Sequence, residues 1–483
     1  MNAFDDIHRG RRSFLKRTAA AGGALVTGST LSILGAHAAW ASSGKGRLGA
    51  GPLVQPYGPL VPAPDRNGDA ILALPGGFRY VTFSKTGSLL LDGSQPVPRN
   101  HDGMGAFPGP KGTVRLIRNH ELRNAPNNFA LGVIGRPATR YDSKGMGGTV
   151  TVDFDPGRMR PVREFVSLNG TIVNCSGGLA FGDAGWITCE ETTAGPNQGW
   201  DKKHGYNFFV PADSLGTVPA VPIVAMGRFS HEASVADPGT GIVYQTEDSG
   251  NESGFYRFVP NAPGNLMAGG RLQMLKVAGQ PAFTGFTGQA VKKLLKCEWV
   301  HIANPDPNVE GGRPSCFRQG RAQGGAAFNR LEGIFRGEGS SIYFVSTSGG
   351  EARLGQLWQY RNASPGKGNL MLVFESPNGS VLDSPDNLCV TPRGSILFCE
   401  DDASGDKDTS ELAPGVADVN RLIGLTRGGL PFTFAVNRLN DSEFAGACFS
   451  PDGNILFVNI FGSSTPGSGM TCAITGPWGR GPI

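Results

Sequence analysis

Short apolar runs alternate with turn-forming residues along this chain, and the segment His231–Gly250 illustrates the pattern. It opens with His231-Glu232, passes through the turn sequence DPGTG and the run IVYQT, and closes with Glu247-Asp248. Alternation with a period of two, interrupted by Pro and Gly, predicts two antiparallel strands joined by a tight turn. Because the first strand of such a hairpin begins where the second ends, acidic side chains meet at one edge.

Five further segments share this outline, namely residues 101–121, 174–192, 331–350, 389–402 and 448–460. The turn glycines are Gly112, Gly185, Gly241, Gly339, Gly394 and Gly453, with successive gaps of 73, 56, 98, 55 and 59 residues. A recurring strand-turn-strand unit at this spacing is typical of a β-propeller, in which each blade is a small sheet. We therefore predict an all-β, six-bladed propeller with an insertion around residues 260–330. A short helix is expected at 288–299, and residues 42–483 are expected to form one domain.

Composition agrees with many short strands and excludes several other classes. The 483 residues include 73 Gly and 35 Pro without a collagen-like period, and the net charge is only +4 with no block of like charge. No specific nucleic-acid partner is therefore expected. The 8 cysteines contain no CxxC pair, which argues against a zinc ribbon. Several of them lie in apolar runs, where a free cysteine behaves as a small hydrophobic residue.

The first 41 residues have the features of an export signal. Arg11-Arg12 is followed by Ser-Phe-Leu-Lys, a weakly apolar stretch and two A-x-A sites, Ala36-His37-Ala38 and Ala39-Trp40-Ala41. This arrangement resembles a twin-arginine (Tat) signal, and an ordinary secretory signal or an uncleaved anchor is the alternative. The apolar stretch is too interrupted by glycine for a stable membrane span. We expect recognition by the Tat machinery and a periplasmic or secreted protein.

Acidic residues occupy the same edge in most of the predicted hairpins. Hairpin geometry pairs Glu232 with Glu247, Cys175 with Glu190 and Glu191, Asp386 and Asn387 with Glu400 and Asp401, Glu332 with Ser346 and Thr347, and Asp102 with Asn119 and Glu121. The first strand of every blade lines the channel of a propeller, so these groups are expected to converge at one mouth. Each acidic pair alone fits a solvated turn, and Cys175 alone fits a buried thiol. Together they favour bound cations: calcium for the oxygens, and a transition metal such as iron or zinc for a thiolate.

The motifs NHE, NCSGG, TCEE, GRFSHEA, PDNL, FCEDD, EFAGACFSPDGNILFVNI and AITGPW resemble, in this order, those of the PhoX-type alkaline phosphatases. The resemblance runs from about residue 75 to the C-terminus. It implies a six-bladed propeller that hydrolyses small phosphate esters at a centre of two ferric and two to three calcium ions. Carried over by motif, the iron-side ligands are Cys175, Glu190, Glu247 and Glu332, and the calcium-side ligands are Glu121, Glu191, Asp386, Asn387, Glu400 and Asp401.

The same resemblance assigns phosphate binding to Arg330, in the run NRLEG, where Leu331 replaces the family's proline. His120, His231, Glu232 and Asp248 are candidates for supporting positions around the ligands, and a monomer is expected. Two other classes stay open. One is a calcium-dependent propeller lactonase or phosphotriesterase, and the other is a non-catalytic propeller whose metals only brace the channel. The lactonase chemistry requires neither Cys175 nor Arg330, so these two residues discriminate it from a PhoX-like phosphatase. A non-catalytic propeller would bind metal without turning over a phosphoester.

Overall fold

The computed structural model describes residues 55–129, 132–309, 315–401 and 408–483. The predicted export signal, residues 1–41, lies outside the described residues. Residues Pro52–Ile483 form one compact unit. No described helix has the length and apolar character needed to cross a membrane.

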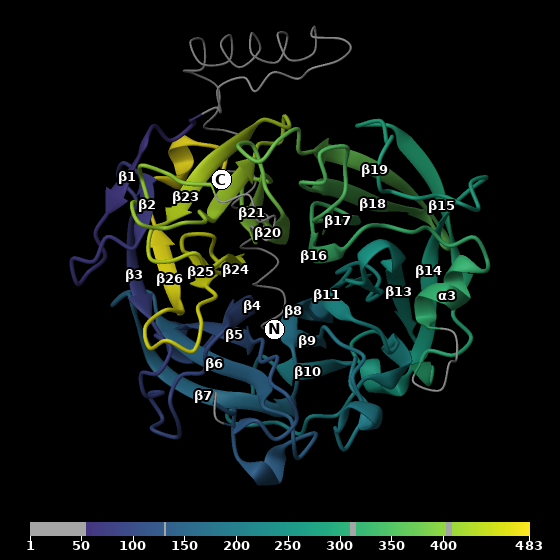
Figure 1. The fold of residues 1–483 in the computed structure, drawn as a ribbon, viewed down its shortest axis with the longest axis horizontal. Coiled ribbons are helices and arrows are strands. Elements are labelled where there is room, and N and C mark those ends of the chain that lie inside the picture. The colour runs from purple at the N-terminus through teal and green to yellow at the C-terminus, as the bar shows by residue number, and fades with distance from the viewer. Residues whose placement is uncertain (1–54, 130–131, 310–314, 402–407) are drawn as a thin grey trace, which may run out of the picture. The chain divides into compact units, whose positions relative to one another are not determined.

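The described residues form an all-β fold of five sheets in a propeller-like arrangement (Figure 1). One sheet contains β4 (His101–Pro108), β5 (Val114–His120), β6 (Gly147–Asp155) and β7 (Arg160–Thr171), and the next contains β8 (Asn174–Leu179), β9 (Gly185–Glu190) and β10 (Asn207–Pro211). A six-stranded sheet has the order β1 (Leu60–Ala63), β2 (Leu72–Pro75), β23 (Pro431–Asn437), β22 (Arg421–Leu425), β21 (Ile396–Glu400), β20 (Pro385–Val390).

The remaining two sheets hold the middle and the end of the chain. A nine-stranded sheet has the order β11 (His231–Ala236), β12 (Val243–Glu247), β13 (Phe255–Pro260), β14 (Gly270–Val277), β15 (Leu294–His301), β19 (Lys367–Glu375), β18 (Gln356–Ser364), β17 (Ser341–Ser346), β16 (Leu331–Arg336). The last sheet joins β24 (Phe444–Phe449), β25 (Leu456–Ile460) and β26 (Met470–Thr475) to β3 (Arg79–Phe83). Short 3-10 turns occupy Pro110–Gly112, Pro137–Thr139, Phe181–Asp183, Pro196–Gln198, Val224–Met226, Gly250–Glu252, Leu266–Ala268 and Trp478–Arg480.

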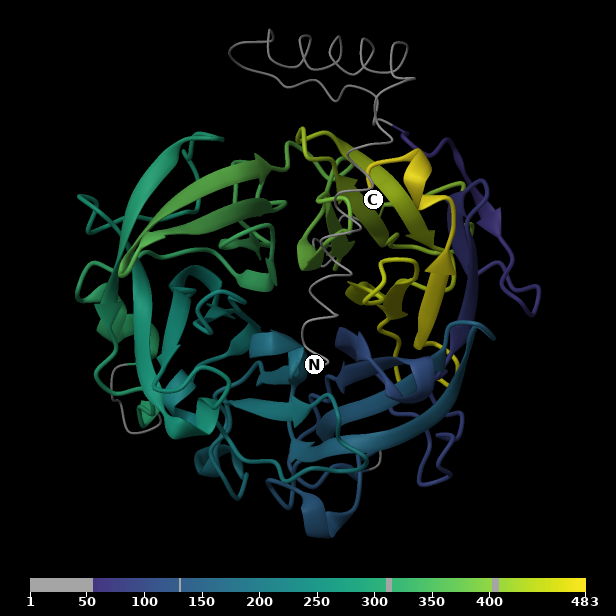
Figure 2. The same cartoon turned by 180° about the vertical axis from the view of Figure 1, so that it is seen from behind.

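The inner ends of the sheets are formed by β4, β8, β11, β16, β20 and β24, and each of these strands contacts the next around a common axis, with β24 returning to β4 (Figures 1 and 2). The ring is tied shut by β3, which comes from the start of the described chain and pairs antiparallel with β26 near its end. Because this sheet combines strands from both ends of the described chain, backbone hydrogen bonds close the ring.

The nine-stranded sheet is two antiparallel meanders, β11–β14 and β16–β19, joined through β15. The expectation of a helix at 288–299 was wrong, because Leu294–His301 is this joining strand. Its side chains alternate between exposed and buried from Leu294 to Glu298, which is the period of a strand and not of a helix. The α-helix of this region is α3 (Cys316–Arg321), which begins at the N-cap Ser315, whose hydroxyl accepts a bond from the Arg318 amide.

The hydrophobic core lies between neighbouring sheets and between the two meanders of the nine-stranded sheet. Between the meanders, the aromatic residues Phe328, Phe344 and Trp358 pack edge to face. All eight cysteines are described, buried and free of disulfides. Cys189, Cys389, Cys399 and Cys448, which lie in apolar runs of the sequence, are buried in strands as expected, whereas Cys175 lies among carboxylates. Most apolar side chains thus lie away from the axis. The ends of the inner strands near the axis carry polar side chains.

Candidate metal centre

Every inner strand has an irregularity at the same place, shortly after it begins. The regular register breaks between His101 and Met104, Asn174 and Gly177, His231 and Ser234, Leu331 and Ile334, Pro385 and Leu388, and Ala445 and Cys448. A β-bulge bends a strand and re-aims one side chain. The residues at the first bulged position are Asp102, Cys175, Glu232, Glu332, Asp386 and Gly446. We call this set the bulge ring.

A second set of positions follows the partner strand in each hairpin. The amides of Glu121, Glu191, Asp248 and Asp401 donate to the carbonyls of the residues that precede the inner strands, at 2.9–3.1 Å. The same bond is made by Thr347 and Phe461 in the two hairpins that lack an acid here. We call these six residues the closing ring. The repeated backbone bond fixes each closing residue beside the bulge of its own hairpin.

The two rings bring seven metal-ligating side chains together. Asp102, Glu121 and Cys175 offer ligand atoms within 4.8 Å of one another, and so do Cys175, Glu191 and Glu232, and Glu232, Glu332 and Asp386. Cys175 and Glu232 belong to two groups each, so the three groups form one continuous chain. We refer to these seven residues as the acidic cluster. It joins five of the six inner hairpins.

The acidic cluster carries more negative charge than its own residues neutralise. Burial, and then the nearby Glu332 and Asp386, raise the pKa of Glu232 well above its usual value. Burial and the surrounding carboxylates raise the pKa of the Cys175 thiol in the same way. Both carboxylate oxygens of Glu232 are fully buried and lack a hydrogen-bond partner among the described residues. A buried carboxylate without a partner is costly, and a cation removes that cost. The donor set, six carboxylates and one thiol, fits metal ions.

Two arginines lie at the edge of the acidic cluster. Arg123 contacts the carboxylates of both Glu121 and Glu191 through Nη2. Arg330 donates from Nε and Nη2 to Asp248, at 3.0–3.3 Å, and from Nη2 to Glu332 Oε1 at 2.6 Å. The Arg330 side chain remains 36% exposed. Arg330 is therefore held by the cluster while part of its surface stays accessible to a ligand.

Four of the carboxylates proposed as ligands from the sequence do not lie in the acidic cluster. Asp401 lies beside it, and the other three, Glu190, Glu247 and Glu400, have partners elsewhere. Glu190 accepts bonds from the amides of Ile172, Gly205 and Tyr206 and from His204 Nδ1, the last at 2.6 Å. Glu247 accepts from the Tyr256 hydroxyl at 2.5 Å, and Glu400 is paired with Arg421 at 2.7 Å. Each is the last residue of its strand. Because successive side chains of a strand point to opposite faces, the residue that faces the cluster is the following one.

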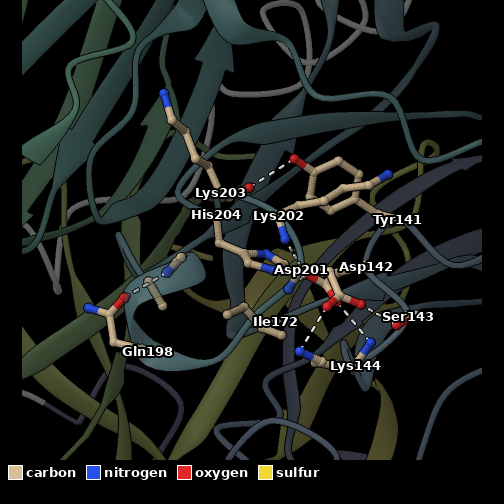
Figure 3. Close-up of polar contacts among 12 residues, drawn as sticks. Tyr141, Asp142, Ser143, Lys144, Ile172, Gln198, Asp201, Lys202, Lys203 and His204 are labelled. Carbon is tan, nitrogen blue, oxygen red and sulfur yellow. Dashed lines mark hydrogen bonds and ion pairs between the residues drawn. The ribbon is translucent and has the colours of Figure 1, made fainter. Parts of the chain in front are cut away.

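The partner of Glu190 belongs to a buried polar network behind the cluster (Figure 3). His204 lies between Glu190 and Asp142, and Asp142 accepts backbone bonds from Lys144, Asp201 and Lys202. Although burial lowers it, Glu190 and Asp142 raise the pKa of His204 to about 9. The imidazolium therefore forms ion pairs with two buried carboxylates, one on each ring nitrogen. Glu190 in turn fixes the amide of Ile172, three residues before Cys175, and so supports the position of the thiol.

The remaining sequence candidates lie around the cluster. Burial lowers the pKa of His231 to about 3; its Nε2 bonds the Gly227 carbonyl, and its ring stacks on Phe229 at 3.6 Å. His120 bonds the Arg99 carbonyl through Nδ1. Asn387 donates to Asp386 and accepts from the Gly446 amide at 2.6 Å, which links two inner strands. Asp401 is close enough to raise the pKa values of Asp386 and Glu121.

Sequence reasoning gave two of the clustered residues too small a role and missed two others. Asp102 was placed near Glu121 without being named a ligand, and Glu232 was given only a supporting position. Arg123 and Glu443 were not singled out; burial and the nearby Asp401 and Asp386 raise the pKa of Glu443. One signal was available for the bulge ring. In five of the six inner strands an acid or thiol is followed by a small residue or Asn, as in Asp102-Gly103, Glu232-Ala233 and Glu332-Gly333.

A propeller-like all-β fold with a buried acidic cluster and arginines at its edge is the arrangement expected of a hydrolase with a candidate metal site near the axis. A family model described as alkaline phosphatase PhoX matches residues 55–158 and 157–467. The chain therefore belongs to the PhoX alkaline phosphatase family, and it is a phosphatase. The predicted relationship to PhoX-type enzymes is confirmed.

One solved structure agrees on the fold, and two others have lower similarity. Pseudomonas fluorescens PhoX in complex with vanadate, a transition state analogue, is 18% identical, with a TM-score of 0.62 over 88% of this chain and 98% of that one. A protein of unknown function from Dyadobacter fermentans is 9% identical, with a TM-score of 0.42 over 83% and 100% of the two chains. A periplasmic gluconolactonase of Pseudomonas aeruginosa is 13% identical, with a TM-score of 0.32 over 71% and 86%. No curated protein matches the chain.

Proposed function

We propose that this protein hydrolyses small phosphate monoesters and releases inorganic phosphate at the acidic cluster. The observation that carries the proposal is a buried, unpartnered carboxylate, Glu232, at the centre of seven ligating groups, with the accessible Arg330 at their edge. Such a site attracts cations, and cations together with an arginine neutralise the charge of a phosphoryl group. The family to which the chain belongs supports the same reaction class.

We propose Asp102, Glu121, Cys175, Glu191, Glu232, Glu332 and Asp386 as the metal-holding residues, with Asp248, Asn387 and Asp401 next to them. Carboxylates favour Ca²⁺, and the single thiol among them favours iron, so a mixed centre of two Fe³⁺ and two to three Ca²⁺ remains our proposal. Ions of this kind would polarise the bound phosphate and lower the pKa of a coordinated water. The chemistry of the donor set supports this assignment.

The chain's own residues are proposed to bind and orient the ester. Arg330 presents a planar guanidinium whose N–H groups suit two phosphate oxygens, and its contacts to Asp248 and Glu332 hold it in place before substrate arrives. Arg123 supplies a second positive charge across the cluster, because it contacts Glu121 and Glu191. In the transition state both charges would stabilise the phosphoryl oxygens.

The architecture and the location of the protein are part of the proposal. We infer that the nine-stranded sheet represents two blades joined at their outer edges by β15, which would make six blades in all. The six inner strands support this count. We also propose Tat-dependent export to the periplasm or beyond, since the cluster would acquire metal before export of the folded chain, and a monomeric state.

Elemental analysis and turnover of p-nitrophenyl phosphate on one sample test the function. Protein exported through its own signal should contain iron near two per chain, and added calcium should stimulate hydrolysis. Cys175→Ser should lose iron and activity. Cys189→Ser is the matched control, because Cys189 is a buried thiol that contacts the Ser234 hydroxyl outside the cluster, and this variant should keep both. Metal binding without hydrolysis of any monoester would refute the proposed function.

A further inference from the structure

A cavity of about 790 Å³ lies between the loops that precede β4 and β6, the outer strand β7 and the segment 215–217. Arg99 and Leu122 are among its lining residues, and they stand next to Asn100 and Glu121 in the chain. The guanidinium of Arg99 is close enough to Glu121 to interact with it electrostatically. The lining of the cavity therefore includes residues next to a member of the acidic cluster and residues of the outer strand β7. Its volume is within the usual range of pockets for small molecules.

The side chains that line the cavity carry a net positive charge, whereas the acidic cluster is negative. Arg99, Arg136 and Arg163 line it, and Asp92 is the acid among the lining residues. Asp92 accepts bonds from the amide and hydroxyl of Ser94. Arg136 and Arg163 form no ion pair with a carboxylate of the described residues. Their charge is thus available to an anion that enters the cavity.

The walls between these arginines are largely apolar. Val97, Val133, Phe165 and Val166 contribute to them, and Arg163 lies over the Phe165 ring at 4.3 Å. The two loops on either side are joined by a bond from the Gly135 amide to Gln95 Oε1 at 2.7 Å. The segment 215–217 is fixed to β7, because Thr217 Oγ1 donates to the Val166 carbonyl at 2.8 Å. The cavity is therefore held open by hydrogen bonds on both sides.

We propose that this cavity is the subsite for the alcohol part of the substrate, and that it selects phosphate monoesters whose alcohol part has apolar surface and a second anionic group. The inference rests on the proposed function, because the reacting phosphate is placed at the acidic cluster. From there the alcohol part extends past Leu122 along the apolar walls. Arg136 and Arg163 bind the second anion at the outer end.

Kinetics on two substrates test the subsite in the metal-loaded enzyme. p-Nitrophenyl phosphate has no second anion, whereas adenosine 3′,5′-bisphosphate has an aromatic group and a second phosphate. Arg136→Ala and Arg163→Gln should each raise KM for the bisphosphate about tenfold, the loss of one charge-assisted contact, and leave p-nitrophenyl phosphate within about twofold. Val133→Trp fills the cavity without changing charge and should raise KM for both esters, since both alcohol parts lie along the apolar walls, with the larger rise for the longer bisphosphate. Arg160→Ala is the matched control, because Arg160 is an exposed arginine of the same strand that does not line the cavity.

The outcomes separate the subsite from the proposed function. Equal KM changes for both substrates, or none for either, would overturn the subsite while the phosphatase function stands. If the wild-type protein hydrolyses neither ester, the proposed function fails, and calorimetric titration with the bisphosphate then decides on the cavity. Binding that weakens about tenfold in Arg136→Ala but not in Arg160→Ala supports the subsite, and the absence of binding by the wild type refutes it.

Discussion

Replacing Glu232 by Gln should have opposite effects on stability with and without metal. The Glu232 carboxylate is fully buried, neither oxygen has a hydrogen-bond partner among the described residues, and Glu332 and Asp386 offer oxygens within 4.8 Å. Two like charges at that distance repel by about 3 kcal/mol at an effective dielectric constant of about 20. An unpaired buried amide costs about 1–3 kcal/mol. In metal-free protein at pH 8 the substitution should therefore stabilise the fold by about 1–2 kcal/mol.

With metal bound, the same substitution removes a charged ligand and should destabilise the fold by about 3–5 kcal/mol, as when one partner of a buried ion pair is lost. Thermal unfolding of chelated and reloaded protein measures both effects. An unfolding entropy of about 2 cal/mol/K per residue makes 1 kcal/mol equivalent to about 1 °C for a chain of this size. We expect a rise in Tm of about 1–2 °C without metal and a fall of about 3–5 °C with it.

Glu164→Gln is the control for this experiment. Glu164 is also buried, but it accepts bonds from the Ser84 hydroxyl and from the Leu91 amide. Its substitution should lower Tm by similar amounts with and without metal. If Glu232→Gln behaves like this control, Glu232 is a structural carboxyl and the reasoning about a cation-binding cluster is wrong.

Three further predictions concern pH and the arginine. The Tm of the chelated protein should fall between pH 5 and pH 9. Burial raises the pKa of Glu121, and a carboxyl whose pKa is raised in the folded state destabilises the fold as pH rises. A Tm that does not change with pH would contradict this. His204→Gln should cost about 3–5 kcal/mol near pH 6 and less above pH 9, since the raised pKa of His204 gives stability that is lost as pH rises through about 9; urea unfolding at both pH values measures it. Arg330→Lys should lower kcat/KM for p-nitrophenyl phosphate about 10²–10³-fold without loss of metal, since lysine keeps the charge but not the planar fork; unchanged kinetics would exclude phosphate contact.

The repeating fold could be predicted from the sequence because its signals are local. A period of two and a turn glycine identify each hairpin, and the end of one strand beside the start of another follows from antiparallel pairing. The joining of two meanders through β15 is not local. It depends on pairing between Leu294–Cys297 and Gly368–Met371, which no short window contains. The run around Leu294 also satisfies part of a helical pattern, which is why the period was misread.

The sequence also predicted the edge of the hairpins at which the cluster lies. It did not determine which of the acidic side chains at that edge belong to the cluster. Adjacent acids, Glu190-Glu191 and Glu247-Asp248, offered two candidates each, and a shift of one residue exchanges the two faces of a strand. The bulges decide which residue faces the axis, and a bulge is set by the neighbouring inner strands. Gly178 illustrates this, because a Cβ there would lie 1.5 Å from the Ser234 carbonyl oxygen of the next strand.

The backbone arrangement of the inner strands repeats six times, but the side chains at the bulge-ring and closing-ring positions do not. Two hairpins differ from the other four. The hairpin β16–β17 has Thr347 in the closing ring, and there the residue before the inner strand is Arg330. The hairpin β24–β25 has Phe461 in the closing ring and Gly446 in the bulge ring, and the residue before its strand is Glu443. Gly446 has φ +61° and a Cβ there would lie 2.5 Å from the Asp102 carbonyl oxygen, so no ligating side chain fits.

A charged residue precedes the inner strand only in these two hairpins, which lack an acid in the closing ring. Elsewhere the same position is held by Asn100, Val173, Ser230 and Ser384. Arg330 therefore lies beside Glu332 in a hairpin whose closing-ring position is held by Thr347 and not by an acid. A phosphate dianion is repelled by carboxylates that neither cations nor arginines accompany. We propose that this asymmetry guides the substrate to a side of the cluster on which an arginine lies, with Arg330 beside Glu332 and Arg123 beside Glu121 and Glu191.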